Sequence, residues 1–278
     1  MPSKTFDTVI DAQTSPHVVI PKEGHTHTMI LLHGGECTAS QFAEELFESQ
    51  GSDSLTLPEI LPSVKWVFPN SGIRNNTRFD VAESQWFDLW SSSHPQERKD
   101  LQIDGLRESI THILNIIRSE AAIVPPERII LGGISQGCAT AIHALLYGGI
   151  RLGGFIGLSG WLPLEEDINI KARWSASNFT LLQRIRTLFK TSNTKATSPR
   201  PLNEDFHNSE LAFKTPVFLS HSKDDDVVPW LNGDMLWWRL EEDLGMEVEW
   251  RLYEEGGHWV NEGRGVDDIV GFLGKVMV

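Results

Sequence analysis

The stretch Arg128-Ile129-Ile130-Leu131-Gly132-Gly133-Ile134-Ser135-Gln136-Gly137 decides the fold of this chain. Its first four residues form a short apolar run typical of a buried strand, and Cys138 to Leu146 continue as an apolar run typical of a helix. Between the two lies the pattern GxSxG, in which glycines two residues either side of the serine let the neighbouring backbone pass without a clash. The sequence therefore predicts a tight strand-to-helix turn that holds the hydroxyl of Ser135 outward.

A serine at such a turn is a candidate nucleophile. The unpaired N–H groups and the positive dipole end of the following helix favour a developing oxyanion. A serine hydroxyl also needs a histidine as base, and that histidine is usually oriented by a carboxylate. In proteins with this turn the acid and then the histidine follow the serine along the chain, each on a loop after a later strand.

Both partners are available downstream of Ser135. The predicted strand Pro216 to Leu219 leads into a loop that carries Asp224, Asp225 and Asp226, and spacing alone does not choose among these three acids, which are also typical of a solvated loop. The predicted strand Val248 to Leu252 leads through two glycines to His258, the one histidine of ten in this position. We therefore expect His258 to be the base.

A second oxyanion donor is expected after an early strand. The predicted strand Thr28 to Leu32 leads into His33-Gly34-Gly35, where glycine lets a backbone N–H approach a substrate oxygen closely. The pair predicted by this pattern is the backbone N–H of Gly35 with that of Gln136, and the alternative is an ordinary glycine turn.

The rest of the chain alternates short apolar runs with helical patterns. Further strands are predicted at Val64 to Phe68 and Gly154 to Leu158, and helices at Leu106 to Ile117, Trp230 to Leu244 and Val266 to Val276. Strands alternating with such helices predict an α/β fold with a mainly parallel central sheet covered by helices on both faces. We expect residues 1–278 to form a single domain.

One segment fits this scheme poorly. About fifty residues from Glu165 to Phe213 separate two predicted strands, more than one crossover usually needs, so we interpret 165–213 as a helical and loop insertion after the nucleophile half. A helix is predicted within it by the apolar residues Phe179, Leu181, Leu182, Ile185, Leu188 and Phe189. Two interpretations remain open: a helix packed on the flank of the domain, or a lid over a substrate cleft.

Composition excludes several classes of function. The 38 acidic and 24 basic residues give a net charge of −14, which repels nucleic acid and anionic lipid, so neither is expected as a partner. No apolar run reaches the roughly 18 residues that span a bilayer, and the first residues lack the basic region and apolar stretch of a signal peptide. A cytoplasmic protein without stable membrane insertion is therefore expected. The two cysteines form no CxxC pattern, and no phosphate-binding or dinucleotide motif is present, so neither a metal nor a cofactor is expected. The sequence leaves the oligomeric state open.

Several patches together resemble the phospholipase/carboxylesterase family of α/β-hydrolases, and within it the acyl-protein thioesterases. They are Leu31-Leu32-His33-Gly34, Trp86-Phe87-Asp88, Pro126 to Gly137, Leu158 to Pro163, His221 to Pro229 and Tyr253 to His258. The resemblance implies the α/β-hydrolase fold, Ser135 as nucleophile, His258 as base, and Asp225 as acid, four residues after His221 in the family's H-x-x-x-D-x-x-V-P loop. It also implies that Trp86 and Phe87 wall a substrate pocket, where the alternative is an ordinary core position.

The implied activity is hydrolysis of a carboxylic ester or thioester, in a small molecule, lipid or acylated protein, through an acyl-enzyme. The chain departs from the family pattern where Glu36 and Cys37 replace a glycine and an aspartate, at Cys138, and in the length of the segment after Pro163. Two alternatives remain open: transfer of the acyl group to an acceptor other than water, and a non-hydrolytic member that binds a ligand in the same cleft.

Overall fold

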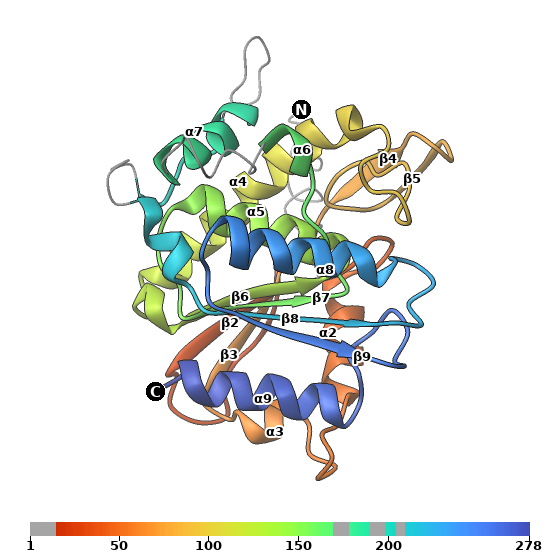
Figure 1. The fold of residues 1–278 in the computed structure, drawn as a ribbon. Coiled ribbons are helices and arrows are strands. Elements are labelled where there is room, and N and C mark those ends of the chain that lie inside the picture. Colours follow the sequence, from red (N-terminus) through yellow and green to blue (C-terminus); the bar gives the residue numbers. More distant parts are fainter. Residues whose placement is uncertain (1–14, 169–177, 190–197, 204–208) are drawn as a thin grey trace, which may run out of the picture.

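A seven-stranded sheet forms the centre of the molecule, in the computed structural model that describes residues 15–168, 178–189, 198–203 and 209–278 (Figure 1). The strand order is β1-β3-β2-β6-β7-β8-β9. Neighbouring strands are parallel except for β1, which pairs antiparallel with β3 at one edge. The strands are β1 (His17–Val19), β2 (His27–Leu32), β3 (Val64–Phe68), β6 (Ile129–Ile134), β7 (Gly154–Leu158), β8 (Val217–Ser222) and β9 (Val248–Tyr253). A separate antiparallel hairpin consists of β4 (Ile73–Asn76) and β5 (Val81–Ser84).

Helices cover both faces of the sheet, as the alternating pattern predicts (Figure 1). On one face lie α4 (Gln102–Ala121), α5 (Gln136–Gly148) and α8 (Trp230–Trp238), and on the other lie α2 (Ala39–Glu48), α3 (Leu57–Ile60) and α9 (Arg264–Val276). Two helices, α6 (Glu165–Ile168) and α7 (Asn178–Leu188), follow β7. Short stretches of other helix types lie at Lys99–Leu101, Pro126–Arg128, Ser209–Lys214 and Arg239–Asp243.

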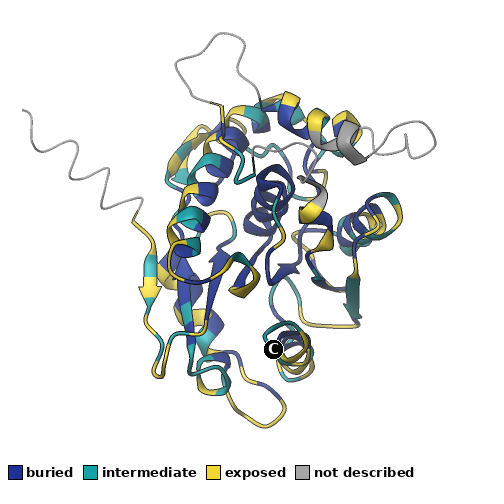
Figure 2. Cartoon of the chain, turned by 90° about the vertical axis from the view of Figure 1, so that its left-hand side faces the viewer, coloured by how far each residue is buried: buried dark blue, intermediate teal, exposed yellow. Residues whose placement is uncertain are grey.

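The central strands are apolar because both of their faces are covered. Every residue of β2, β6, β7 and β8 is buried, and Figure 2 shows these strands as the dark interior of the molecule. Two clusters of buried side chains lie on either side of the sheet, one under α4, α5 and α8 and the other under α2 and α9. The expected α/β-hydrolase architecture, a mainly parallel sheet between two helical layers, is confirmed.

The described part of the insertion packs against the flank of the domain. Ile185 and Phe189, in and just after α7, are fully buried. The ring of Phe189 lies edge-on to His143 of α5, with ring centroids 5.4 Å apart. The backbone carbonyl of Phe189 accepts a hydrogen bond from Arg107 of α4. The side chains of Phe179, Leu181 and Leu182, which the helix prediction used, lie outside the described residues.

Among the described residues, no helix is long and apolar enough to cross a membrane.

Candidate active site

Ser135 occupies the tight turn between β6 and α5. Its backbone has φ 56° and ψ −126°, an uncommon conformation for a residue with a side chain, and α5 begins at the next residue. The turn requires glycine at Gly137, because a Cβ there would lie 2.4 Å from the carbonyl oxygens of Leu32 and His33. The predicted strand, turn and helix are therefore all present, with Ser135 at the N-terminus of α5.

Asp225 and His258 meet across the carboxyl ends of two neighbouring parallel strands. Asp225 lies on the loop after β8 and His258 on the loop after β9, and Nδ1 of His258 is 2.7 Å from Oδ2 of Asp225. The second carboxylate oxygen of Asp225 accepts hydrogen bonds from the backbone N–H groups of Val227 (3.0 Å) and Val228 (2.8 Å). These three contacts fix the plane of the carboxylate and the orientation of the imidazole.

The two neighbouring aspartates make different contacts. The carboxylate of Asp224 accepts hydrogen bonds from the backbone N–H groups of Gly256 and Gly257, so it holds the glycine loop that leads to His258. Asp226 is exposed. Of the three acids that spacing left open, Asp225 is the one hydrogen-bonded to a histidine.

A second histidine, which sequence reasoning did not assign, lies behind Asp225. Nε2 of His221 is 3.0 Å from Oδ2 of Asp225 and 2.9 Å from the carbonyl oxygen of Val228. Burial alone would raise the pKa of Asp225, but hydrogen bonds from His221, His258 and the Val228 N–H, with the charge of His258, hold that pKa well below its usual range. The signal was present in the sequence, since His221 lies only four residues before Asp225, near the end of β8.

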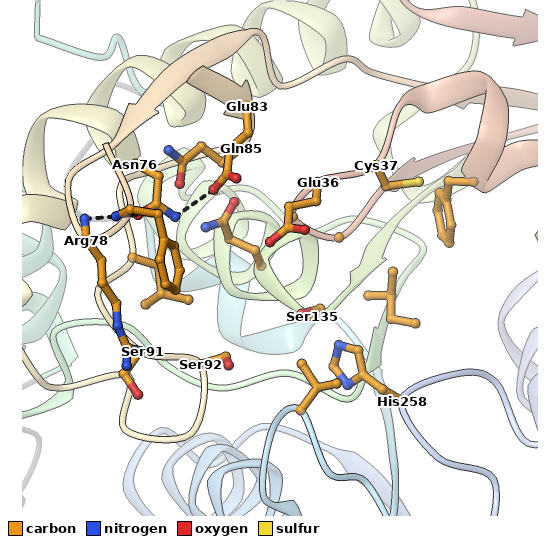
Figure 3. Close-up of a pocket in the computed structure, with 18 of the residues that line it drawn as sticks. Glu36, Cys37, Asn76, Arg78, Glu83, Gln85, Ser91, Ser92, Ser135 and His258 are labelled. Atoms are coloured by element: carbon orange, nitrogen blue, oxygen red, sulfur yellow. Dashed lines mark hydrogen bonds between the residues drawn. The ribbon is translucent and has the colours of Figure 1, made fainter. Parts of the chain in front are cut away.

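Ser135 and His258 line one cavity with a volume of about 510 Å³ (Figure 3). One part of its wall comes from the β4–β5 hairpin and the loop after it, with side chains that include Asn76, Arg78, Glu83 and Gln85. Another part comes from Phe42 and Glu45 of α2 and from Trp259, directly after His258. Within the described chain no hydrogen bond joins Ser135 Oγ to His258; in related sites such contacts are often long without substrate and tighten with it.

Gly35 and Gln136, the two candidate oxyanion donors, line the same cavity. The loop of Gly35 is shaped by His33, whose Nδ1 lies 2.6 Å from the Gly34 carbonyl oxygen and whose Nε2 lies 3.2 Å from the Ser71 backbone nitrogen. Burial lowers the pKa of His33 to about 4, so it is neutral at pH 7 and its Nδ1–H donates to Gly34. This leaves Nε2 as the acceptor for the Ser71 N–H.

Trp86 and Phe87 do not line the cavity. Both are fully buried, and they hold the side chain of Gln136: the backbone N–H of Trp86 donates to Gln136 Oε1 at 2.7 Å, and Gln136 Nε2 donates to the Phe87 carbonyl at 2.9 Å. The core position that the sequence left as the alternative is therefore where the structure places them. Their contact with the site runs through Gln136 and not through a pocket wall.

No described residue between 165 and 213 lines the cavity either. Within the described chain there is also no group of three or more histidine, cysteine or acidic side chains that could hold a metal ion.

The model of the phospholipase/carboxylesterase family matches residues 13–184 of the chain. The chain belongs to this family. It is 29% identical over 246 residues to acyl-protein thioesterase 1 of Yarrowia lipolytica, covering 86% of this chain and 88% of that protein. It is 26% identical over 265 residues to acyl-protein thioesterase 1 of Gibberella zeae, covering 94% of this chain and 95% of that protein.

Solved structures agree with this assignment. The crystal structure of Zea mays acyl-protein thioesterase 2 superposes with a TM-score of 0.69 and 25% identity, over 95% of this chain and all of that one. Membership of the family supports a hydrolase of esters or thioesters, and it confirms the resemblance inferred from the sequence patches.

Proposed function

We propose that this protein is a serine hydrolase that cleaves carboxylic esters or thioesters through an acyl-enzyme on Ser135. The observation that carries the proposal is the 2.7 Å contact between His258 Nδ1 and Asp225 Oδ2 at the cavity that Ser135 lines. With Nδ1–H bonded to the carboxylate, Nε2 of His258 is the unprotonated nitrogen that can act as base.

In this mechanism His258 removes the proton of Ser135 as its oxygen attacks the acyl carbonyl. The backbone N–H groups of Gly35 and Gln136 stabilise the oxyanion, and the protonated His258 then gives its proton to the leaving oxygen or sulfur. Water repeats the two steps on the acyl-enzyme and releases the acid. Asp225, held ionised by its hydrogen bonds, stabilises the imidazolium of His258 in both halves of the reaction.

The proposal is tested with p-nitrophenyl esters and acyl thioesters of two to sixteen carbons, using the wild type and Ser135→Ala in parallel. We expect Ser135→Ala to lower turnover by at least about a thousandfold with the fold intact, as in other triad enzymes. A burst of one p-nitrophenol per chain would report the acyl-enzyme directly. If no ester or thioester is hydrolysed in a Ser135-dependent way, the proposal is wrong, and acyl transfer or ligand binding becomes the better hypothesis.

A further inference from the structure

A carboxylate lines the cavity of the candidate nucleophile. Glu36 follows the oxyanion candidate Gly35 and has φ 60°, in the left-handed region that favours glycine. Its backbone N–H donates to the Ser84 carbonyl at 2.7 Å, which fixes the loop against the β5 strand. The side chain is exposed, lines the cavity, and in Figure 3 points its carboxylate into the pocket on the side of Ser135.

A second acidic residue lines the same cavity. Glu45 of α2 is among its lining residues, together with Cys37, Phe42 and Trp259, the residue after the candidate base. The rings of Phe42 and Trp259 are in edge contact, with centroids 5.9 Å apart. Burial and the charge of Glu45 together raise the pKa of the Cys37 thiol, which agrees with the carboxylate of Glu45 facing the same space.

Positive charge is scarce in this cavity. Among the described residues that line it, Glu36, Glu45 and Glu83 are acidic, and the one lysine or arginine is Arg78. The guanidinium of Arg78 is already engaged, since its Nη1 donates to the Trp90 carbonyl at 2.8 Å and its Cζ lies 5.2 Å from the ring of Phe79. Glu83 is also engaged, through a 2.6 Å hydrogen bond from Asn76. No side-chain hydrogen bond or ion pair is found for Glu36 or Glu45 within the described chain.

Two acidic residues that line the cavity of the candidate nucleophile disfavour an anionic substrate. They favour one that brings its own positive charge, and carboxylates combined with aromatic faces are the groups that recognise ammonium ions. The leaving group is protonated by His258, and Glu45 and Trp259 line the same cavity as this histidine.

We propose that the site selects esters and thioesters whose leaving group carries a positive charge. A quaternary ammonium alcohol or thiol has this chemistry, and so does an acylated cysteine flanked by lysines. This inference rests on the proposed function, because it concerns the leaving group of the reaction at Ser135.

The test compares two matched pairs of substrates. One is S-butyrylthiocholine against S-(3,3-dimethylbutyl) thiobutyrate, in which carbon replaces the charged nitrogen. The other is a hexapeptide with an S-octanoyl cysteine flanked by lysines against the same peptide with glutamines. At low salt we expect kcat/KM to favour the charged member of at least one pair by about tenfold, with the ratio falling as salt screens the interaction.

The variants Glu36→Gln and Glu45→Gln should each lower this ratio by about threefold, a size typical of partly exposed charge pairs. Glu44→Gln is the matched control, because Glu44 is an exposed neighbour on α2 that does not line the cavity, and it should leave the ratio unchanged. The substrate pair with the larger kcat/KM ratio shows whether the positive charge comes from a quaternary ammonium group or from lysines that flank the acylated cysteine.

A ratio near one in both pairs, or a ratio that neither glutamine variant changes, overturns this inference. Ser135-dependent hydrolysis of the neutral thioesters in the same experiment would leave the proposed function intact. Absence of turnover for all four substrates would count against both.

Discussion

Nε2 of His221 lies 3.0 Å from Oδ2 of Asp225, and neither side chain has any solvent-exposed surface. The same nitrogen is 2.9 Å from the Val228 carbonyl, which can only accept a hydrogen bond, so Nε2 carries the proton. His221 is therefore a fixed donor to the carboxylate that faces His258. We infer that it is a positioning residue, which acts on the reaction through Asp225.

Two replacements of His221 distinguish the role of its hydrogen bond to Asp225 from the role of its side-chain volume. His221→Leu removes the donor, and loss of a buried hydrogen bond of about 1–3 kcal/mol predicts a fall in kcat of about tenfold to a hundredfold with KM nearly unchanged. His221→Gln can place an amide N–H near the position of Nε2 and should retain most of the activity. Steady-state kinetics, with thermal unfolding to follow the fold, would measure both. Equal kcat values for the two variants would show that the hydrogen bond has no role.

The lowered pKa of Asp225 predicts how stability depends on pH. In the unfolded chain this carboxyl titrates near its ordinary value of about 3.9, so between that pH and its lower folded pKa the unfolded state binds more protons. The stabilisation by ionised Asp225 is thus fully present above about pH 5 and is lost as the pH falls through this window.

Urea unfolding of the wild type and Asp225→Asn from pH 3 to 7 would test this relationship. The difference in the free energy of unfolding between the wild type and Asp225→Asn should be constant near neutral pH and should shrink below about pH 4. Asp226 lies on the same loop but is exposed, so the free energy of unfolding of Asp226→Asn should equal that of the wild type at every pH. A difference between wild type and Asp225→Asn that does not change with pH would contradict the assignment.

The fold was largely predictable because its centre consists of buried parallel strands, which are continuous apolar runs. The strands at Val64–Phe68 and Gly154–Leu158 were predicted with their observed bounds. The sequence did not reveal β1, an edge strand of three residues. It also did not reveal the polar β4–β5 hairpin, which forms a separate two-stranded sheet. These short elements are set by tertiary contacts that local pattern does not contain.

The site was predictable where chain order and local context constrain it. Ser135 and His258 followed from the turn and from the glycine loop after the last strand. The choice among the three aspartates depended on which carboxylate meets a histidine in space, which only the resemblance or the structure supplies. The same holds for Trp86 and Phe87, whose places in the sequence do not tell whether they face a cavity or the core.

Glycine at position 137 is predicted to be essential for folding. An alanine Cβ there would lie 2.4 Å from two backbone carbonyl oxygens, which cannot move without displacing β2. Gly137→Ala should therefore lower the free energy of unfolding by at least about 2 kcal/mol. Gly271→Ala is the control, because this glycine is exposed on α9 with open space around its Cβ position, and alanine should stabilise the helix by up to about 1 kcal/mol. Denaturant unfolding of both variants measures the contrast, and equal effects would mean that the turn tolerates a side chain.

Phe189 distinguishes the two interpretations of the insertion. Its ring is fully buried against His143 and Tyr147 of α5, and no described residue of 165–213 lines the cavity. If the segment is a packed flank, Phe189→Ala should cost about 3–5 kcal/mol of stability, and the milder Phe189→Leu about 1 kcal/mol, while the preference for acyl chain length stays unchanged. A lid predicts the opposite pattern, because loosening it would shift kcat/KM between two-carbon and sixteen-carbon esters. Phe189→Leu decides between them, since it should remain folded. A changed length preference with little loss of stability would favour the lid, because in the described chain Phe189 packs on α5 and does not line the cavity.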